Sequence, residues 1–321
     1  MSIRALVARE DRVSFEELDE LPPNDVTIDV AYSSLNYKDG LAVTRRGRIV
    51  RKFPMVLGID LAGTVVASND PSFTPGMKVL GTGQGLGESD WGGYATRESV
   101  RADAIVPVPD GMSLEQSMQL GTAGITAMLC VLALERNRVI PDEREVIVTG
   151  AAGGVGSIAV MLLAKLGYKV AASTGRPELE PYLRGLGATS IIPREELSSK
   201  PGAPMQSERW AGGIDTVGGV TLANVFAQTA YEGAIASCGM AGGHELNTTV
   251  WPLILRNVSI LGVSSIRTSK AERMAGWSRL AREVDFAKLA EMSRTEPLDK
   301  IFELSEEILA GNVRGRVVIE I

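Results

Sequence analysis

A glycine-rich segment in the middle of the chain carries the clearest chemical pattern in the sequence. The segment EVIVTGAAGGVGSIAVMLLAKLG reads as a buried strand, a tight turn and an apolar helix. Gly153 lets the backbone approach a ligand closely because it has no Cβ, and Gly156 permits tight packing of the helix against the strand. The amides that open the helix, at Gly154 and Val155, favour an anion. This arrangement predicts a site for the pyrophosphate of a dinucleotide.

The turn departs at one position from the G-x-G-x-x-G fingerprint of such sites. Ala151 occupies the first glycine position, and Gly153 and Gly156 occupy the other two. The departure is small, and Gly150 just before it can help the turn. A purely structural interpretation is that the glycines only allow a strand to turn into a helix. The strand before, the helix after and a second strand at the expected spacing together favour the nucleotide site.

The residues after the next strand indicate which dinucleotide is bound. An NAD site needs an acid about 20 residues after the turn to bind the ribose hydroxyls. This chain instead has Ser173, Thr174, Gly175 and Arg176 at that point. Hydroxyls and a guanidinium suit a 2′-phosphate, and no carboxylate would repel it. Arg194, at the tip of the following strand, offers a second cation or is a solvated surface residue. The expected cofactor is therefore NADPH.

The scarcity of histidine and cysteine excludes several other chemistries. The 321 residues include one histidine, His244, and two cysteines, Cys130 and Cys238, which lie far apart in the sequence. One subunit therefore lacks the ligands of a His/Cys zinc site and of a C-x-x-C redox pair. A Ser-His-Asp triad would have to use His244, for which a structural role in a Gly-rich loop is favoured. No metal site is expected.

Composition and charge describe a globular protein that does not bind nucleic acid. With 33 basic and 39 acidic residues the net charge is -6, so no overall basic field attracts a phosphate backbone. The first residues show no apolar signal segment, and no stretch reaches the roughly 18 uninterrupted apolar residues of a membrane span. We expect a cytoplasmic protein without a membrane partner.

Two different sequence patterns along the chain predict two domains and an α/β fold class. Up to about residue 109, short apolar or alternating runs separated by Gly, Pro and Asp predict a bent, mostly antiparallel β domain. After Ser113, strands and helices alternate strictly, which predicts a doubly wound parallel sheet. A charged helical stretch and a closing strand then return to the first domain. The predicted division is 1–117 with 265–321 for one domain and 118–264 for the other.

Several motifs resemble the medium-chain dehydrogenase/reductase superfamily over nearly the whole chain. They include SSLNYKDGLA, FPMVLGIDLAGTVV, GTAGITAMLCVLAL, VTGAAGGVGSIAV, STGR, IDTVGG and ILRNVSILGVSS. The similarity is to a zinc-independent branch, the quinone oxidoreductases of the YhdH/YhfP type, to which acrylyl-CoA reductases belong. It implies a GroES-like first domain, a Rossmann domain, a cleft between them and a homodimer formed through residues 259–263. Asn36 stands where zinc alcohol dehydrogenases of the superfamily carry cysteine.

The resemblance implies a reaction that needs no metal. A reductase without a Lewis acid cannot easily polarise a simple ketone, but it can reduce a C=C bond conjugated to a carbonyl. We expect hydride transfer to the β-carbon, an enolate held by hydrogen bonds and protonation of the α-carbon. Tyr37 is the candidate for contact with the nicotinamide or substrate and for proton donation, Asn36 for orienting the carbonyl, and Asp39 completes the catalytic group. In a structural alternative Asn36 and Asp39 cap a turn, Lys38 pairs with Asp39, and Tyr37 fills a pocket.

The resemblance also places further residues around the cofactor. They are Thr122, Gly239, Met240, Leu261, Gly262, Val263 and Arg316. Arg316 could reach a phosphate, or it could face solvent on the last strand.

A basic segment between Thr44 and Lys52 offers contacts for a charged substrate. Arg45, Arg46 and Arg48 are candidates for binding the phosphates of coenzyme A, with a solvated surface as the alternative. The expected small-molecule acceptor is a short 2-enoyl-CoA such as acrylyl-CoA. The other hypotheses are a quinone acceptor and a dinucleotide-binding sensor without turnover.

Overall fold

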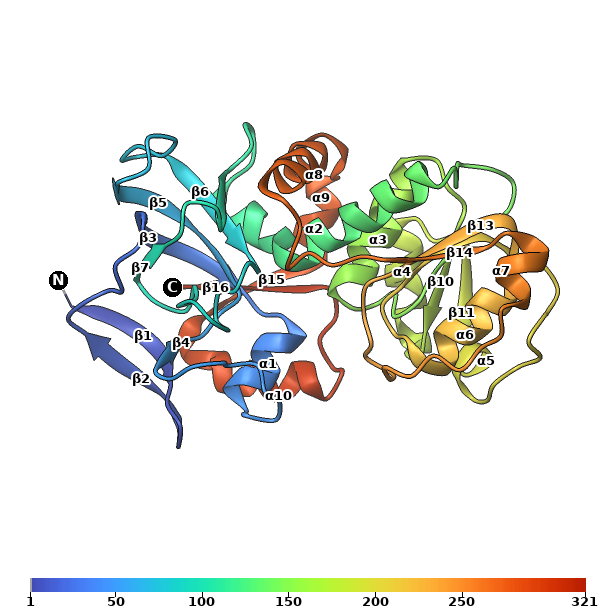
Figure 1. Ribbon diagram of the computed structural model, residues 1–321, viewed down its shortest axis with the longest axis horizontal. Coiled ribbons are helices and arrows are strands. Elements are labelled where there is room, and N and C mark those ends of the chain that lie inside the picture. Colours follow the sequence, from blue (N-terminus) through green and yellow to red (C-terminus); the bar gives the residue numbers. More distant parts are fainter. Residues whose placement is uncertain (1) are drawn as a thin grey trace. The chain divides into compact units, whose positions relative to one another are not determined.

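The computed structural model describes residues 2–321, whose contacts divide into two compact units (Figure 1). Unit 1 comprises Met1–Ile125, Ser265–Arg282 and Leu289–Ile321. Unit 2 comprises Thr126–Ser264 and Glu283–Lys288. Each unit has its own sheet structure and its own apolar core, so each is described by itself.

Unit 1 is built mainly on antiparallel strands, as predicted. Its larger sheet has the order β15-β16-β3-β5-β6-β8, with β7 paired to β3. These strands are β3 (Val26–Ser34), β5 (Asp60–Ser68), β6 (Lys78–Thr82), β7 (Arg97–Val100), β8 (Ile105–Pro107), β15 (Ser293–Pro297) and β16 (Arg316–Glu320). A smaller sheet has the order β2-β1-β4 and consists of β1 (Ile3–Ala8), β2 (Val13–Leu18) and β4 (Met55–Val56). Alternate residues of β3 point into the core, as the period of two in its sequence requires.

The helices of unit 1 pack against one another and beside its larger sheet. α1 (Tyr37–Val43) packs on α10 (Ile301–Leu309), which follows the short helix η2 (Leu298–Lys300). A Cβ at Gly40 would lie 2.8 Å from Cγ2 of Ile308, so the glycine permits this close approach. α8 (Lys270–Glu283) is attached to β8 through Arg273, whose guanidinium donates to the carbonyl of Ala104 at 3.0 Å; α9 (Phe286–Glu291) follows it.

Unit 2 is a doubly wound parallel sheet, which confirms the predicted class. The strand order is β11-β10-β9-β12-β13-β14, and every pair is parallel. The strands are β9 (Val146–Val148), β10 (Val170–Thr174), β11 (Ser190–Pro193), β12 (Trp210–Asp215), β13 (Thr229–Ser237) and β14 (Ser259–Gly262). From β9 the chain adds β10 and β11 on one side of the sheet, and from β12 it adds β13 and β14 on the other side. The strand order therefore reverses between β9 and β12, and ligands of such sheets bind at that point.

Helices cover both faces of this sheet (Figure 1). On one face α3 (Gly154–Lys165) contacts α4 (Glu180–Leu186), which follows η1 (Pro177–Leu179); on the other α5 (Arg194–Ser198) contacts α6 (Gly219–Gln228). Trp210 and Phe226 are fully buried in the core beneath α6. α7 (Trp251–Arg256) packs against β13 near the edge of the sheet.

The long helix α2 (Leu114–Arg136) is bent. Gly121 adopts φ 52° and ψ -154°, a conformation outside the helical region, so two helices meet at this residue. By length and composition α2 could cross a membrane, but 83% of its most apolar window is buried inside the protein. Such burial is typical of a core helix.

Candidate active site

The glycine-rich turn after β9 has one crowded side and one open side. A Cβ at Gly156 would lie 2.7 Å from the Cα of Ala151, so only glycine lets α3 pack this close to the turn. Ala151 is buried and donates its N–H to the carbonyl of Ser173 on β10 at 3.0 Å. A Cβ at Gly153, by contrast, would meet only the carbonyl oxygen of Gly150, at 3.3 Å. The open side at Gly153 leaves room for a ligand to approach the backbone.

The first turn of α3 fits an anion. Gly153 is the N-cap residue and provides no side-chain cap, and the first turn contains no acidic residue. Gly153, Gly154 and Val155 are all partly exposed. The backbone amides at the start of a helix lack acceptors within the helix, so they favour a negatively charged group. The turn therefore has the cradle that a pyrophosphate requires.

Two arginines converge on the end of β10. Arg176 donates to the carbonyl of Ala152 at 3.3 Å, so its guanidinium reaches the glycine-rich turn. The guanidinium of Arg194 covers Gly175, where a Cβ would lie 2.5 Å from Nε of Arg194. Thr174 is buried together with Ser173, and its hydroxyl accepts the N–H of Arg176 at 3.1 Å. The positive charge at this strand end fits a phosphate on the adenosine ribose.

The other predicted cofactor residues of unit 2 lie at the same edge of the sheet. Gly239 and Met240 follow β13, and Met240 is exposed. Leu261 pairs with Ala236 in the β13–β14 register and precedes Gly262, the last residue of β14. Val263 donates its N–H to the carbonyl of Ser237 at 2.9 Å, which continues this pairing. The ends of parallel strands thus bring together residues that the sequence separates widely.

Asp215, at the end of β12, belongs to the site although the sequence analysis did not single it out. Its carboxylate accepts from the hydroxyl of Thr149 at 2.7 Å and from the N–H of Gly218 at 2.9 Å. It therefore joins the turn after β9 to the loop after β12. Burial raises the pKa of Asp215 above its usual value, and the hydrogen bond from Thr149 opposes this effect.

The two cysteines meet in unit 2 despite their separation in the sequence. Contact with Cys238 and burial raise the pKa of the Cys130 thiol well above its ordinary value. Cys238 donates to the carbonyl of Asp215 at 3.5 Å, and both thiols are free. A thiol with a raised pKa is a poor nucleophile, so the position of Cys130 does not favour nucleophilic chemistry.

In unit 1 the three candidate catalytic residues lie at the start of α1 but differ in exposure. Asn36 is the N-cap, and its N–H donates to Oδ2 of Asp39 at 2.9 Å. Asn36 and Asp39 are 8% and 1% exposed, whereas Tyr37 is 51% exposed. The structural alternative is wrong on one point, because Lys38 pairs with Glu88 at 2.7 Å instead of Asp39.

Asp60, which the sequence analysis also missed, is the centre of a buried polar cluster beneath these residues. It is the first residue of β5 and is fully buried. Its carboxylate accepts from the amide of Asn36 at 2.9 Å, from Ser34 Oγ at 2.5 Å, and from the N–H and hydroxyl of Thr122 at 2.9 and 2.5 Å. An aspartate inside the apolar run LGIDLAGTVV was the available clue, since such a group is buried only when its partners are in place.

Burial shifts the pKa of two groups in this cluster, Asp39 and Arg316. Burial raises the pKa of Asp39 to about 7, and the neighbouring Asp60 adds to this shift. N–H groups of Ile59 and Asn36 donate to Asp39 and act in the opposite direction. The cluster thus pairs two buried carboxyl groups with one buried cation, Arg316, whose own pKa burial lowers and the carboxylates raise.

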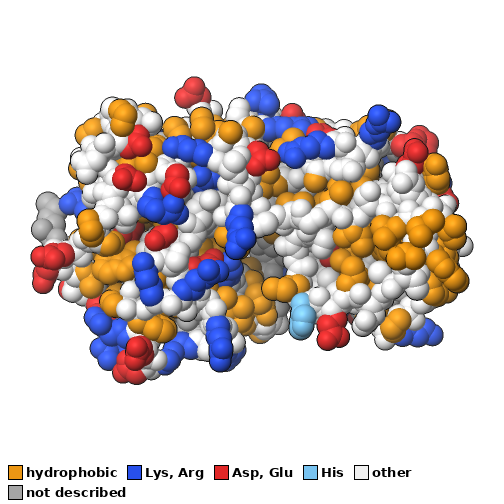
Figure 2. Space-filling model, in the orientation of Figure 1, with side chains coloured by type: hydrophobic (Ala, Val, Ile, Leu, Met, Phe, Trp, Pro, Cys, Tyr) orange, Lys and Arg blue, Asp and Glu red, His pale blue; other side chains and the backbone are white. Residues whose placement is uncertain are grey.

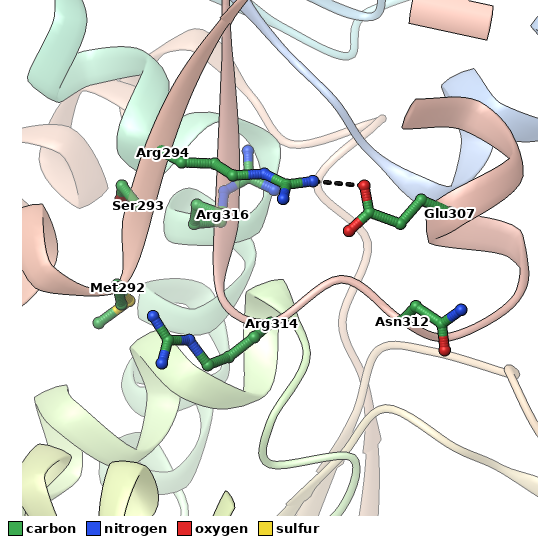
Figure 3. Close-up of a pocket in the computed structure, with 7 residues that line it drawn as sticks. All are labelled: Met292, Ser293, Arg294, Glu307, Asn312, Arg314 and Arg316. Carbon is green, nitrogen blue, oxygen red and sulfur yellow. Dashed lines mark hydrogen bonds and ion pairs between the residues drawn. The ribbon is translucent and has the colours of Figure 1, made fainter. Parts of the chain in front are cut away.

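Arg316 is this buried cation, and the expectation that it faces solvent is wrong. It is 3% exposed, and its guanidinium donates to Ser34 Oγ at 2.8 Å and to the carbonyl of Gln119 at 3.0 Å. A pocket of about 250 Å³ lies beside it. Figure 3 shows the residues that line this pocket, with Arg294 paired to Glu307. The pocket is lined by Met292, Ser293, Arg294, Glu307, Asn312, Arg314 and Arg316. Because the guanidinium of Arg316 is bonded within the cluster, the structure gives it a contact with Asn36 and Ser34 instead of a free phosphate-binding position.

The basic segment of unit 1 is exposed, and part of its charge is already paired. Arg45 donates to the carbonyls of Glu10 and Asp11, and Arg46 forms an ion pair with Glu306 at 2.8 Å. Arg48 is exposed. Figure 2 shows Lys and Arg side chains grouped on the face over unit 1.

Both units match known protein families. Residues 22–110 match the model of the alcohol dehydrogenase GroES-like domain, and residues 154–281 match the model named zinc-binding dehydrogenase. Within residues 2–321 there is no group of three or more His, Cys, Asp or Glu residues that could hold a metal ion, and His244 is exposed in the loop after β13. The fold and the site define a medium-chain dehydrogenase/reductase.

Curated relatives narrow the class to one branch. The chain is 49% identical to acrylyl-CoA reductase AcuI of Ruegeria pomeroyi, over 95% of this chain and 92% of the relative. It is 43% identical to a Bacillus subtilis protein that bears the name quinone oxidoreductase YhfP, over 94% of this chain and 92% of the relative. The chain therefore belongs to the medium-chain dehydrogenase/reductase superfamily, in the branch that contains YhdH, YhfP and AcuI.

Solved structures agree with this assignment. YhdH of Escherichia coli K-12, solved with bound NADPH, superposes with a TM-score of 0.95 at 46% identity and covers 98% of this chain and 99% of its own. YhfP of Bacillus subtilis, solved with bound NAD, gives a TM-score of 0.96 at 41% identity, with complete coverage of both chains. The predicted GroES-like and Rossmann domains are confirmed by these matches.

Proposed function

We propose that the protein is an NADPH-dependent oxidoreductase that reduces an activated C=C bond, with acrylyl-CoA as substrate and propanoyl-CoA as product. The observation that carries the proposal is the pair Arg176 and Arg194 beside the uncapped start of α3, in a chain 49% identical to an acrylyl-CoA reductase. The arginines suit the 2′-phosphate, and the helix start suits the pyrophosphate.

The residues of unit 2 hold the cofactor in this proposal. The amides of Gly154 and Val155 bind the pyrophosphate, and Gly153 leaves room for it. Arg176 and Arg194 bind the 2′-phosphate, which NADH lacks. When bound, NADPH supplies the hydride that reduces the β-carbon of the substrate.

In unit 1 we assign the role of proton donor to Tyr37 and a supporting role to the neighbouring residues Asn36 and Asp39. Tyr37 is half-exposed at the first position of α1, so its hydroxyl is accessible to a substrate and can donate a proton to the α-carbon of the enolate. The amide of Asn36 instead donates to Asp60 and Asp39 inside the protein. We therefore assign Asn36 and Asp39 to holding α1 in place, and not to contact with substrate.

A spectrophotometric assay tests the proposal directly. Oxidation of NADPH is followed with acrylyl-CoA, with a benzoquinone and without an acceptor, and each reaction is repeated with NADH. We expect turnover with acrylyl-CoA and a preference for NADPH. Turnover with the quinone alone would assign the quinone reductase activity that the name of YhfP suggests. NADPH binding without turnover of any acceptor would favour a sensor.

Tyr37→Phe tests the proton donor within this assay. We expect a large loss of kcat with an unchanged Kd for NADPH, because the substitution removes only the hydroxyl. Unchanged turnover would exclude Tyr37 as the donor.

For the coenzyme A portion of the substrate we propose the basic segment. Arg48 is exposed, whereas Arg45 and Arg46 must exchange contacts within the protein for contacts with phosphate. Combined replacement of the three arginines by alanine should raise KM for acrylyl-CoA but not for acrylyl-pantetheine, which lacks the nucleotide phosphates. Equal KM changes for the two thioesters would remove the segment from the substrate site.

We further propose a homodimer formed through unit 2. β14 is an edge strand, and α7 near it exposes Trp251, Ile254 and Leu255 by 53%, 72% and 62%. Figure 2 shows apolar side chains gathered over this part of unit 2. Such a patch is typical of an interface. Ile254→Glu should yield monomers in sedimentation equilibrium, while Ile140→Glu, at an exposed site elsewhere in unit 2, should not.

We assign the protein to the cytoplasm. Both cysteines are free thiols although they lie close together, which suits a reducing compartment.

A further inference from the structure

A short segment of unit 1, from Arg51 to Pro54, is fixed to the protein through its backbone. The N–H of Arg51 donates to the carbonyl of Glu88 at 2.8 Å, and the carbonyl of Pro54 accepts the indole N–H of Trp91 at 3.3 Å. Glu88 and Trp91 belong to the loop between β6 and β7, in which the carbonyl of Gly85 accepts three backbone N–H groups. The segment is therefore held at both ends by a loop that has hydrogen bonds of its own.

The side chains of this segment are exposed, although its backbone is anchored. The side chain of Arg51 is 70% exposed, and its Nη2 lies 3.8 Å from Oε2 of Glu88. Lys52 is exposed, and the ring of Phe53 is 45% exposed. Solvent thus meets two basic side chains followed by an aromatic ring, all carried by a fixed backbone.

Two basic side chains beside an aromatic ring are suited to binding a nucleotide. Guanidinium and ammonium groups donate to phosphate oxygens, and the face of an aromatic ring stacks on a base. A base that covers Phe53 would also remove apolar surface from water, which is favourable. The segment therefore fits a ligand that has both a phosphate and a base.

Glu88 places this segment beside the start of α1. Its carboxylate accepts from Nζ of Lys38 at 2.7 Å, and its carbonyl accepts from the N–H of Arg51. The side chain of Glu88 is only 9% exposed, so this junction lies inside the protein. Lys38 directly follows Tyr37, the proposed proton donor, along α1. The position suits a substrate whose nucleotide is joined by an arm to its reacting group.

We propose that residues 51–53 form a subsite for the nucleotide of a coenzyme A thioester, in which Phe53 stacks on the adenine while Arg51 and Lys52 bind the 3′-phosphate. The pantetheine arm then leads from this subsite to the reacting C=C bond at Tyr37. The proposal rests on the proposed function, since it takes an acyl-CoA as the substrate. It adds recognition of the base to the phosphate contacts assigned to the three arginines earlier in the basic segment.

Three thioesters with the same acrylyl group separate the parts of this recognition. Acrylyl-CoA carries the base and the 3′-phosphate, acrylyl-dephospho-CoA lacks that phosphate, and acrylyl-pantetheine lacks the whole nucleotide. Values of kcat/KM are measured for each with the full-length protein at saturating NADPH. For the wild type we expect a fall of about two- to fivefold on loss of the 3′-phosphate and a further fall of at least about fivefold on loss of the nucleotide.

Phe53→Leu removes the aromatic face and keeps an apolar side chain. Its kcat/KM should fall roughly fivefold or more for acrylyl-CoA and acrylyl-dephospho-CoA and stay unchanged for acrylyl-pantetheine. Turnover of acrylyl-pantetheine also reports that the variant is folded. Phe302→Leu is the matched control, because Phe302 is 41% exposed on α10 of the same unit and its ring contacts Phe15; the ratios among the three thioesters should equal those of the wild type.

The double variant Arg51→Gln, Lys52→Gln tests the phosphate contacts. It should reduce acrylyl-CoA and acrylyl-dephospho-CoA with equal kcat/KM, because the 3′-phosphate has lost its partners. Arg12→Gln, at a side chain that is 57% exposed, is the control and should keep the preference for acrylyl-CoA. A preference that the double variant retains would overturn the assignment of the phosphate.

The outcomes separate the subsite from the proposed function. A wild type that reduces the three thioesters with equal kcat/KM would overturn the subsite while the proposed function stands. A Phe53→Leu variant that loses activity equally on all three thioesters, or on none, would also overturn it. A wild type that reduces none of the three would overturn the proposed function and the subsite together.

Discussion

The two arginines at the end of β10 lead to a quantitative prediction about cofactor choice. Arg176 is partly buried and hydrogen-bonded to the glycine-rich turn, so a charge-assisted bond from it to the 2′-phosphate contributes about 1.5–3 kcal/mol. The side chain of Arg194 is 59% exposed, so solvent reduces its contribution to about 0.2–1 kcal/mol. Arg176→Gln should therefore weaken NADPH binding roughly 10- to 150-fold, and Arg194→Gln no more than about fivefold.

Isothermal titration with NADPH and with NADH measures this effect. The Kd for NADH should stay the same in both variants, because NADH has no 2′-phosphate to lose a partner. Arg184→Gln is the matched control: Arg184 lies on α4 in an exposed ion pair with Glu180, and its loss should change neither Kd. Equal weakening of NADPH and NADH, or a larger effect at Arg194 than at Arg176, would refute the assignment.

Four further predictions concern stability, cofactor binding and pH. Gly156→Ala places a Cβ 2.7 Å from the Cα of Ala151 and should lower the free energy of unfolding by about 1–3 kcal/mol. Gly153→Ala should leave thermal stability unchanged yet weaken NADPH binding in a fluorescence titration, because only its open side is filled. Arg316→Met leaves two buried carboxyl groups without their cation and should cost about 3–5 kcal/mol in urea unfolding. The pKa of Asp39 is raised to about 7 from 3.8, so its stabilising contribution is complete below about pH 4 and is lost as the pH rises to about 7. Asparagine cannot ionise, so in denaturant titrations of Asp39→Asn the free energy of unfolding should fall less steeply with pH, by roughly 1.4 kcal/mol per pH unit. Parallel pH profiles of the variant and the wild type would contradict the raised pKa.

The regular elements of unit 2 were predictable because burial on both faces leaves a strong pattern. The strand in EVIVTG and the helix after Gly153 can be recognised from their own segments, because the spacing of apolar residues marks each element and glycine marks the turn between them. α7 was missed because WPLILR is short and its apolar side chains are largely exposed, so no inward-facing stripe exists to detect. The charged stretch predicted as one helix is two, α8 and α9, with a break at Asp285, whose carboxylate accepts from the N–H of Ala287.

The site was only half predictable, for a physical reason. A phosphate site made of backbone amides is formed by residues that are adjacent in the sequence. The turn at Gly153 could therefore be predicted from its own segment. The cluster around Asp60 depends on contacts between β5, α1, α2 and β16, and no local period reports them. Arg316 illustrates the difference: its partners Ser34 and Asn36 are 282 and 280 positions away. The bend at Gly121 was hidden for the same reason, since this residue lies against the carboxylate of Asp60, which is distant in the sequence.

The late position of Arg316 has a consequence for biosynthesis. A nascent chain that has emerged only through its Rossmann segment already contains Asp39 and Asp60 but not the guanidinium that neutralises them. Until β16 is translated and added beside β3, these acids remain hydrated and the loop before α1 is not anchored. The polar cluster of unit 1 can therefore form only after β16 has been synthesised, which is later than the strands and helices of the Rossmann segment.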